Sequence, residues 1–145
     1  MYTIKTPGTH DEFKAYYALR YKVLSEPWGH AKGTEKDDFE PISEHFMAVD
    51  EKGEIVGVAK LYEKSDGVGY VSHLAVAAAH QHQDVGQLLL KAVELRARAR
   101  GFHTLGTMER INETSYFEKC GFHIAGVPSP HLGITHLVWL EKALT

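Results

Sequence analysis

The chain has 145 residues, of which 43% are hydrophobic and 24% are charged, with a formal net charge of −3, so it has the composition of a globular protein large enough to bury its own core. This mild acidity argues against nucleic acid or an anionic membrane surface as the main partner, because both require a clustered basic face. No apolar run approaches the roughly 20 residues that cross a bilayer, so we expect no membrane partner.

The first half of the chain predicts a strand, a helix and a three-strand meander. Residues 2–5 read as a short strand. Thr9 and Glu12 form a capping box, which opens a helix that ends by Gly29. Residues 29–41 are polar and acidic and predict a loop with a short helical turn. Further strands are expected at 44–50, 54–62 and 68–76, joined by tight turns.

The second half predicts two helices and three strands. Apolar residues at helical spacing indicate a helix from near Val85 to Gly101. A strand at 103–107 and a short helix at 112–119 follow. This order predicts one domain, residues 1–145, of the α/β (α+β) class, with a mixed sheet and helices on both of its faces. The last two strands are expected at 122–127 and 134–141, separated by a turn at the Pro-Ser-Pro segment 128–130.

The ten histidines do not indicate a metal site. The closest pair is His80 and His82, and no paired cysteines or His-Glu-x-x-His spacing accompany it. We therefore predict no metal. The single Cys120 fits a reducing compartment, and residues 1–5 lack the layout of a secretory signal, so we expect a cytoplasmic protein.

Three features that suit a phosphate group coincide in the middle of the chain. A strand ends at Leu74, Ala75 and Val76, a short loop follows, and an amphipathic helix begins near Val85. A helix N-terminus presents unpaired backbone N–H groups and the positive end of the helix dipole, so it attracts anions. Gly86, in the first turn, leaves room for a ligand to approach the backbone. The segment therefore predicts a phosphate-binding loop.

Two motifs resemble the GNAT superfamily of acyl-CoA N-acyltransferases, whose order of elements also matches nearly the whole chain. The loop pattern of the family is Gln/Arg-x-x-Gly-x-Gly/Ala. Gln81 and Gly86 match its first and last positions, and Asp84 stands in place of the middle glycine. Residues 112–122 resemble the second motif, Asn-Ala-x-x-Phe-Tyr-Glu-Lys-x-Gly-Phe. The segments that resemble one branch of the family are 19–24 and 35–38.

The resemblance implies a mixed, mostly antiparallel central sheet of about seven strands with helices on both faces. It implies an N-acetyltransferase that moves an acetyl group from acetyl-CoA to a primary amine of a small molecule or peptide by direct attack. The thioester carbonyl is expected to accept a hydrogen bond from a backbone N–H near Leu74 or Val76. The implied coenzyme contacts are Leu74, Ala75, Val76, Gln81, His82, Gln83, Asp84, Val85, Gly86, Gln87, Asn112, Phe117 and Lys119.

Asp84 departs from the family at a position where glycine is usual. Asp tolerates left-handed backbone better than most residues, and its carboxylate is alternatively able to cap the following helix. Either role places a negative charge near the expected pyrophosphate. We therefore expect weaker coenzyme binding, unless the side chain of Asp84 turns to solvent.

Catalysis requires a base for the amine and a proton donor for the departing thiolate. Many family members carry a donor Tyr where this chain has Phe117, and Tyr116 would lie about 100° away on the same helix. Tyr70 stands where some relatives place a Glu base, although a phenol is a poor base at neutral pH. His73 points away from Ser72 unless a bulge intervenes, and it either acts through a water or simply packs. The catalytic candidates are therefore Tyr70, His73 and Tyr116.

The sequence leaves open which amine is the acceptor and whether the protein catalyses acetyl transfer at all. The acidic residues Glu35, Asp37 and Asp38 either attract a cationic amine or are simply solvated. Trp28 and Tyr21 either line the acceptor pocket or pack the first helix. The departures at positions 84 and 117 also fit a non-catalytic acyl-CoA-binding protein of the same fold. Pairing through the last strand would make a homodimer.

Overall fold

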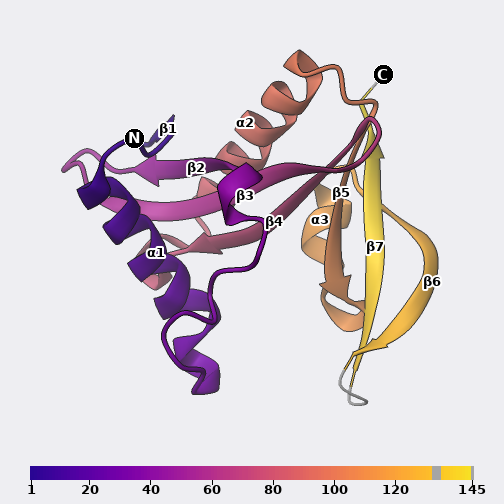
Figure 1. Ribbon diagram of the computed structural model, residues 1–145, viewed down its shortest axis with the longest axis horizontal. Coiled ribbons are helices and arrows are strands. Elements are labelled where there is room, and N and C mark those ends of the chain that lie inside the picture. The colour runs from indigo at the N-terminus through magenta and orange to yellow at the C-terminus, as the bar shows by residue number, and fades with distance from the viewer. Residues whose placement is uncertain (132–134, 145) are drawn as a thin grey trace.

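A seven-stranded mixed sheet organises the computed structural model, which describes residues 1–131 and 135–144 (Figure 1). The strand order is β1-β2-β3-β4-β5-β7-β6, and β4 and β5 run parallel while the other described neighbours run antiparallel. The strands are β1 (Thr3–Lys5), β2 (Glu44–Val49), β3 (Ile55–Ser65), β4 (Val68–Val76), β5 (Thr104–Arg110), β6 (His123–His131) and β7 (Thr135–Ala143). The helices are α1 (His10–Leu24), α2 (Val85–Ala99) and α3 (Ser115–Lys119), with single 3-10 turns η1 (Glu26–Trp28), η2 (Glu40–Ile42), η3 (Ala78–His80) and η4 (Ile111–Glu113).

Helix α1 begins at the predicted capping box. The backbone N–H of Glu12 donates to Thr9 Oγ1 at 3.1 Å, and the N–H of Thr9 donates to Glu12 Oε1 at 3.1 Å. Two amide groups at the helix start are thereby satisfied. The buried side of α1 packs Tyr16 against Met47 and Val58, on one face of β2 and β3.

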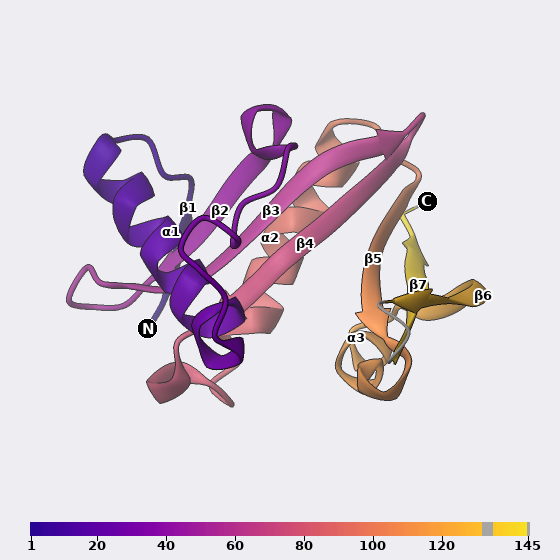
Figure 2. The same ribbon diagram turned by 60° about the horizontal axis from the view of Figure 1, so that its bottom comes forward.

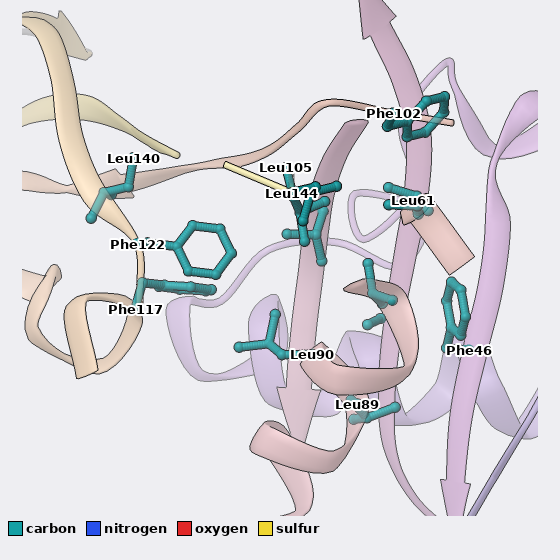
Figure 3. Close-up of a cluster of buried hydrophobic side chains, with 14 of the residues drawn as sticks. Phe46, Leu61, Leu89, Leu90, Phe102, Leu105, Phe117, Phe122, Leu140 and Leu144 are labelled. Atoms are coloured by element: carbon teal, nitrogen blue, oxygen red, sulfur yellow. The ribbon is translucent and has the colours of Figure 1, made fainter. Parts of the chain in front are cut away.

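Helix α2 covers the opposite face of the sheet (Figure 2). Its buried residues Leu89, Leu90 and Val93 recur at helical spacing and join the main hydrophobic core (Figure 3). The helix approaches β3 closely because Gly57 has no side chain. A β-carbon there would lie 2.9 Å from Leu89 Cδ1 and 2.9 Å from Val85 Cγ1. The predicted fold class, with helices on both faces of the sheet, is confirmed.

Strands β4 and β5 begin side by side and then diverge (Figures 1 and 2). Their parallel pairing covers Val68 to Tyr70 on β4 and Thr104 to Gly106 on β5. Beyond Tyr70 the edge of β4 that faces β5 pairs with no strand in the described part of the chain, because β5 continues alongside β7. This edge therefore presents backbone N–H and C=O groups to another partner.

The predicted turn at residues 128–130 is wrong, because β6 extends through these positions to His131. β6 is an edge strand that pairs with β7 on one side, so a proline, which lacks an N–H, interrupts no second ladder. Gly126 has φ 85°, and the register with β7 shifts between Ala125 and Ser129, as at a β-bulge. The link to β7 includes residues 132–134, which lie outside the described residues.

The helix expected at 112–119 is divided into η4 and α3 at Thr114, which is buried. Phe117 on α3 packs edge-on against Phe122, with ring centroids 5.5 Å apart. Both rings belong to the same core as Leu90 of α2 (Figure 3). α3 also approaches the start of α2, where the hydroxyl of Tyr116 lies beside Gly86.

Candidate active site

A β-bulge in β4 sets the geometry of the site. Between Ser72 and Ala75, β4 advances by three residues while its partner strand β3 advances by two, so His73 and Leu74 together oppose one residue of β3. His73 has φ 54°, in the left-handed region. The sequence allowed His73 to turn towards the site only through such a bulge, and the bulge is present.

A cavity of about 450 Å³ lies between the diverging strands, and we call it the interstrand cavity. β4 contributes one wall and β5 the other, because the two strands separate beyond their paired segment. Its lining residues are Leu24, Tyr70, Val71, Ser72, His73, Leu74, Thr107, Met108, Glu109, Glu113, Tyr116 and Phe117.

A second cavity, of about 590 Å³, lies at the N-terminus of α2, and we call it the helix-end cavity. Leu74 and Tyr116 line both cavities, so the two are neighbours along the edge of β4. The lining residues of the helix-end cavity are Val23, Leu74, Ala75, Val76, His80, Gln81, His82, Asp84, Val85, Gly86, Gln87, Tyr116 and Lys119.

The N-terminus of α2 carries backbone amides that the helix does not use, as anion-binding helix starts do. The first α-helical hydrogen bond runs from the N–H of Leu88 to the carbonyl of Asp84, at 3.0 Å, so the amides of the preceding turn are not used by the helix. Asp84 adopts φ 64° and makes no side-chain capping bond, so of its two expected roles the left-handed backbone is the one observed. Gly86 leaves the first turn open except for the Tyr116 hydroxyl, which lies where a β-carbon would stand.

Side-chain hydrogen bonds hold the loop before α2. Gln81 Nε2 donates to the carbonyl of Val76 at 3.1 Å and ties the loop to the end of β4. The hydroxyl of Tyr2 donates to Gln83 Oε1 at 2.8 Å and lies 2.9 Å from His80 Nδ1. The N-terminal segment therefore fixes the loop, a role that the sequence did not indicate for Tyr2.

Most of the residues expected to contact a coenzyme gather at these cavities. Gln83 and Asn112 line neither one: Gln83 binds Tyr2, and Asn112 is exposed on η4. Phe117 lines the interstrand cavity. Those that line the helix-end cavity are Leu74, Ala75, Val76, Gln81, His82, Asp84, Val85, Gly86, Gln87 and Lys119.

The three catalytic candidates Tyr70, His73 and Tyr116 all line the interstrand cavity. Burial raises the pKa of Tyr70 to about 12, so its phenol stays protonated. Burial, together with the positive charges of Arg20 and Lys60, lowers the pKa of His73 to about 4, so its imidazole is neutral at pH 7. Neutral His73 is able to accept a proton but is a weak base.

Tyr116 and its neighbour Phe117 differ in burial and in what they contact. Phe117 is 6% exposed and packs into the core, whereas Tyr116 is 39% exposed and lies at the junction of the cavities. Their rings are perpendicular, with centroids 5.5 Å apart. Burial and nearby Cys120 and Asp84 raise the pKa of Tyr116 to about 12, so its hydroxyl carries a proton at neutral pH.

Comparison with known proteins identifies the family of this chain. A model of the acetyltransferase (GNAT) family matches residues 10–122 of the chain. The chain belongs to this family. The predicted GNAT resemblance and the predicted class of enzyme, the acyl-CoA N-acyltransferases, are thereby confirmed.

Individual relatives of this GNAT chain are distant. An amino-acid acetyltransferase from Pseudomonas fluorescens (strain Pf0-1) is 34% identical over 85 residues, which are 58% of this chain and 19% of that protein. The chain thus spans about a fifth of the length of such curated relatives. A provisionally assigned N-acetyltransferase from Lactobacillus plantarum shares the fold with a TM-score of 0.87, at 23% identity over 99% of each chain. A GNAT acetyltransferase from Elizabethkingia anophelis with acetyl-CoA bound has a TM-score of 0.77, at 23% identity over 98% of this chain and 97% of that chain.

Two carboxylates of the interstrand cavity were not indicated by the sequence. Glu109, near the end of β5, and Glu113, on η4, both line the interstrand cavity. Burial and the neighbouring charge of Glu113 raise the pKa of Glu109. The signal that would have found Glu109 is its place at the carboxyl end of a strand that runs parallel to β4, where ligand sites concentrate in open sheets.

Most acidic side chains of the loop after α1 bind other parts of the protein, whereas Asp38 is exposed. Arg20 Nη1 donates to Glu40 Oε1 at 2.9 Å, and Lys60 Nζ lies 3.1 Å from Glu40 Oε2 and also pairs with Asp37. Burial by itself raises the pKa of Glu40, but the N–H of Asp37 and the two cations lower it to about 2. Glu35 is buried and accepts from the N–H of Gly33 at 2.8 Å. Most of the acidic loop therefore binds the protein itself.

The remaining expectations for the acceptor pocket fall outside the interstrand cavity. Trp28 is 63% exposed, and Arg110 Cζ lies 5.2 Å from the centroid of its ring. The hydroxyl of Tyr21 donates to the carbonyl of His30 at 2.9 Å. Across the described residues, no three His, Cys, Asp or Glu side chains gather in a way that would hold a metal ion. No helix in residues 1–131 and 135–144 is long and apolar enough to cross a membrane.

Proposed function

We propose that this chain is an N-acetyltransferase that moves an acetyl group from acetyl-CoA to a primary amine of a small molecule or peptide. The observation that carries the proposal is that Leu74 and Tyr116 line both the helix-end cavity and the interstrand cavity, which are therefore neighbours. One cavity suits a pyrophosphate, the other suits an acceptor, and the thioester would lie between them.

Coenzyme A would bind along α2 and β4. The unused amides in the first turn of α2 would receive the pyrophosphate, and Gly86 allows it to reach the backbone. The pantetheine arm would pair with the free edge of β4 from Leu74 to Val76, in the manner of an added strand. The acetyl-CoA bound to the related protein from Elizabethkingia anophelis supports this choice of cosubstrate.

The reaction would proceed by direct attack. The amine nitrogen, once it has lost a proton, attacks the thioester carbonyl carbon, a C–N bond forms and the C–S bond breaks. A backbone N–H of β4 near the bulge would donate to the carbonyl oxygen, because the bulge removes His73 and Leu74 from regular pairing with β3.

Proton transfer would involve the groups around the junction. Tyr116 would donate its phenolic proton to the departing thiolate, because it alone of the three catalytic candidates also lines the helix-end cavity. Its raised pKa keeps that proton available at neutral pH. Neutral His73 and the Tyr70 hydroxyl would position the amine or a water beside it.

A second candidate, a non-catalytic acyl-CoA-binding protein, is favoured by Phe117 at the usual donor position and by Asp84 at the usual glycine. Release of free thiol from acetyl-CoA, measured over a panel of amines, separates the two. Release that depends on an amine supports the enzyme. Binding of acetyl-CoA in a calorimeter without release over every amine would favour the binding protein.

A further inference from the structure

We infer that the acceptor is a small aliphatic diamine or polyamine without a carboxylate beside its amino group, and that Glu109 and Glu113 select it. The inference rests on the proposed N-acetyltransferase activity and names the substrate class of the same site. It follows from the two carboxylates that line the interstrand cavity and from the contacts that the surrounding cations make with other groups.

The lining of the interstrand cavity carries negative charge alone. Glu109 and Glu113 contribute carboxylates, whereas no lysine or arginine of the described residues lines this cavity. Neither glutamate takes part in a salt bridge within residues 1–131 and 135–144. A ligand ammonium would therefore meet two carboxylates that no salt bridge neutralises.

The cations around this cavity have other contacts. Lys64 lies over the ring of Trp139, with its Nζ 4.1 Å from the ring centroid. Arg20 and Lys60, whose charges act on His73, are fully buried and paired with Glu40, and Lys60 also binds Asp37. Together these two cations and two carboxylates cancel. The neighbour of Glu109 in sequence, Arg110, places its guanidinium over the ring of Trp28. Its charge acts to lower the pKa of Glu109, but burial and Glu113 outweigh it, and the pKa of Glu109 is raised.

His73 also lines the interstrand cavity, and its imidazole is neutral at pH 7. An imidazole with a pKa of about 4 adds no positive charge at pH 7. A free amino acid would bring its own carboxylate into this site, next to two others and without a cation to bind it. Like charges at that distance disfavour the complex, so the site discriminates by repulsion as well as by attraction.

The two glutamates have different parts in the reaction. Glu109 is partly buried, and burial together with Glu113 raises its pKa, so it is suited to take a proton from the ammonium group that reacts. Two protons leave the nitrogen. R–NH3+ gives the first to the Glu109 carboxylate and becomes the nucleophile R–NH2, and the second leaves after the C–N bond has formed and replaces the proton that Tyr116 gives to the departing thiolate. Glu113 is exposed on η4 and would pair with the second ammonium group, which stays protonated.

The test compares amines that differ by one carboxylate. 1,5-Diaminopentane and L-lysine have the same carbon skeleton apart from the carboxylate, and n-pentylamine lacks the second charge. Thiol release from acetyl-CoA should give kcat/KM for 1,5-diaminopentane at least about tenfold above the values for L-lysine and L-glutamate. It should also exceed the value for n-pentylamine.

Variants assign the two roles. Glu109→Gln should lower kcat by about 10²-fold with every amine. Glu113→Gln should raise the KM for the diamine by only about fivefold, because an exposed ion pair contributes little. The KM for n-pentylamine should not change, because this amine has no second ammonium group. Glu54→Gln, which removes the same charge from the exposed β2–β3 hairpin, should change neither value. Unchanged acetyl-CoA binding in all three variants establishes that they fold.

Three results overturn the inference in distinguishable ways. Faster release with L-lysine or L-glutamate than with 1,5-diaminopentane would overturn the substrate class and leave the acetyltransferase intact. Wild-type kinetics in both glutamate variants would overturn the assigned roles. Acetyl-CoA binding without release over any amine would overturn the proposed function itself and the inference with it.

Discussion

The hydroxyl of Tyr116, on α3, lies beside Gly86, in the first turn of α2, at the point where a β-carbon on Gly86 would stand. The two residues come from the two motifs that resemble the GNAT family, and their contact brings these motifs together at one cavity. Because glycine leaves this space, one hydroxyl reaches the end of the helix where an anion would bind.

The contact predicts the effect of Gly86→Ala. A helix gains about 1 kcal/mol from this change, so folding should not suffer. The new methyl group competes with the Tyr116 hydroxyl, and either the methyl group or the displaced ring then fills part of the helix-end cavity. The coenzyme would then meet a partly filled site, so the Kd for acetyl-CoA, measured by calorimetry, should rise about tenfold, which corresponds to about 1.4 kcal/mol.

The double variant Gly86→Ala with Tyr116→Phe is the matched control, because it removes the atom that the methyl group meets. It should recover part of the lost affinity. An unchanged Kd in Gly86→Ala alone would show that the coenzyme does not approach the first turn of α2.

A second prediction concerns the charge and backbone of Asp84. Asp84→Asn keeps a residue that tolerates φ 64° and removes the charge, whereas Asp84→Gly also removes the left-handed strain. A carboxylate about 5 Å from a phosphate costs about 1 kcal/mol in water, so both variants should bind acetyl-CoA about fourfold more tightly. Calorimetry on both variants measures this.

The two Asp84 variants separate charge from conformation. Tighter binding in Asp84→Gly alone would mean that the backbone matters and the charge does not. Equal, unchanged affinity in both would mean that the Asp84 carboxylate faces solvent in the complex, the case in which the sequence expected no penalty.

A third prediction tests the proton donor. Tyr116→Phe should lower kcat by about 10²-fold and leave the Kd for acetyl-CoA within about twofold, because general acid catalysis is lost and the packing is kept. Phe117→Tyr in that background restores a phenol on the wall of the interstrand cavity, and part of the rate should return. Thiol release under saturating amine is the measurement. A wild-type kcat in Tyr116→Phe would mean that the thiolate leaves without this hydroxyl.

A fourth prediction follows from the lowered pKa of His73. The unfolded chain binds a proton on this group below pH 6.5, while the folded protein binds it only below about 4. The free energy of unfolding should therefore fall as the pH is lowered from 6.5 to 4, and this residue should have no such effect above about pH 7. His73 alone contributes up to about 3 kcal/mol to this loss.

His73→Asn isolates that contribution, since Asn accepts the positive φ of this position. Urea unfolding at pH 7, 5 and 4 should show a shallower loss of stability in the variant. Part of the slope should remain, because burial also lowers the pKa of His45. Identical slopes in the two proteins would contradict a buried, neutral His73.

A fifth prediction concerns the buried ion pairs behind the site. Arg20→Met removes one of the two cations that bind Glu40, and Lys60→Met removes the other together with the partner of Asp37, so each should lower the free energy of unfolding by about 3–5 kcal/mol. Lys5→Met is the matched control, because the Lys5–Glu12 pair is exposed and should cost at most about 1 kcal/mol. Equal effects in all three would mean that the buried network contributes no more than a surface pair.

The order of the elements was open to prediction because it depends on local patterns. The capping box at Thr9 and Glu12 is present, as are the helix after Val85 and the meander that precedes it. Local signals are least reliable where the position of a segment in the sheet decides whether it forms a strand or a turn. The Pro-Ser-Pro segment 128–130 has the composition of a turn, yet it continues an edge strand, because an edge strand tolerates prolines.

The candidate site was predictable to the extent that it depends on one strand end and one helix start. Gln81, Asp84 and Gly86 gather at the helix-end cavity because they adjoin in sequence. Glu109 belongs to a different strand, and its approach to Tyr70 and His73 depends on how far β4 and β5 diverge. No spacing in the sequence encodes that separation.

By itself, therefore, the sequence determined a GNAT-like order of elements, and it predicted an anion-binding loop between the end of one strand and the start of a helix. The tertiary structure decided the rest. The bulge turns His73 into the site, the left-handed Asp84 opens α2, and Tyr116 rather than Phe117 joins the cavities. These outcomes depend on packing between elements distant in sequence, because only the folded chain fixes which side of a residue faces a ligand.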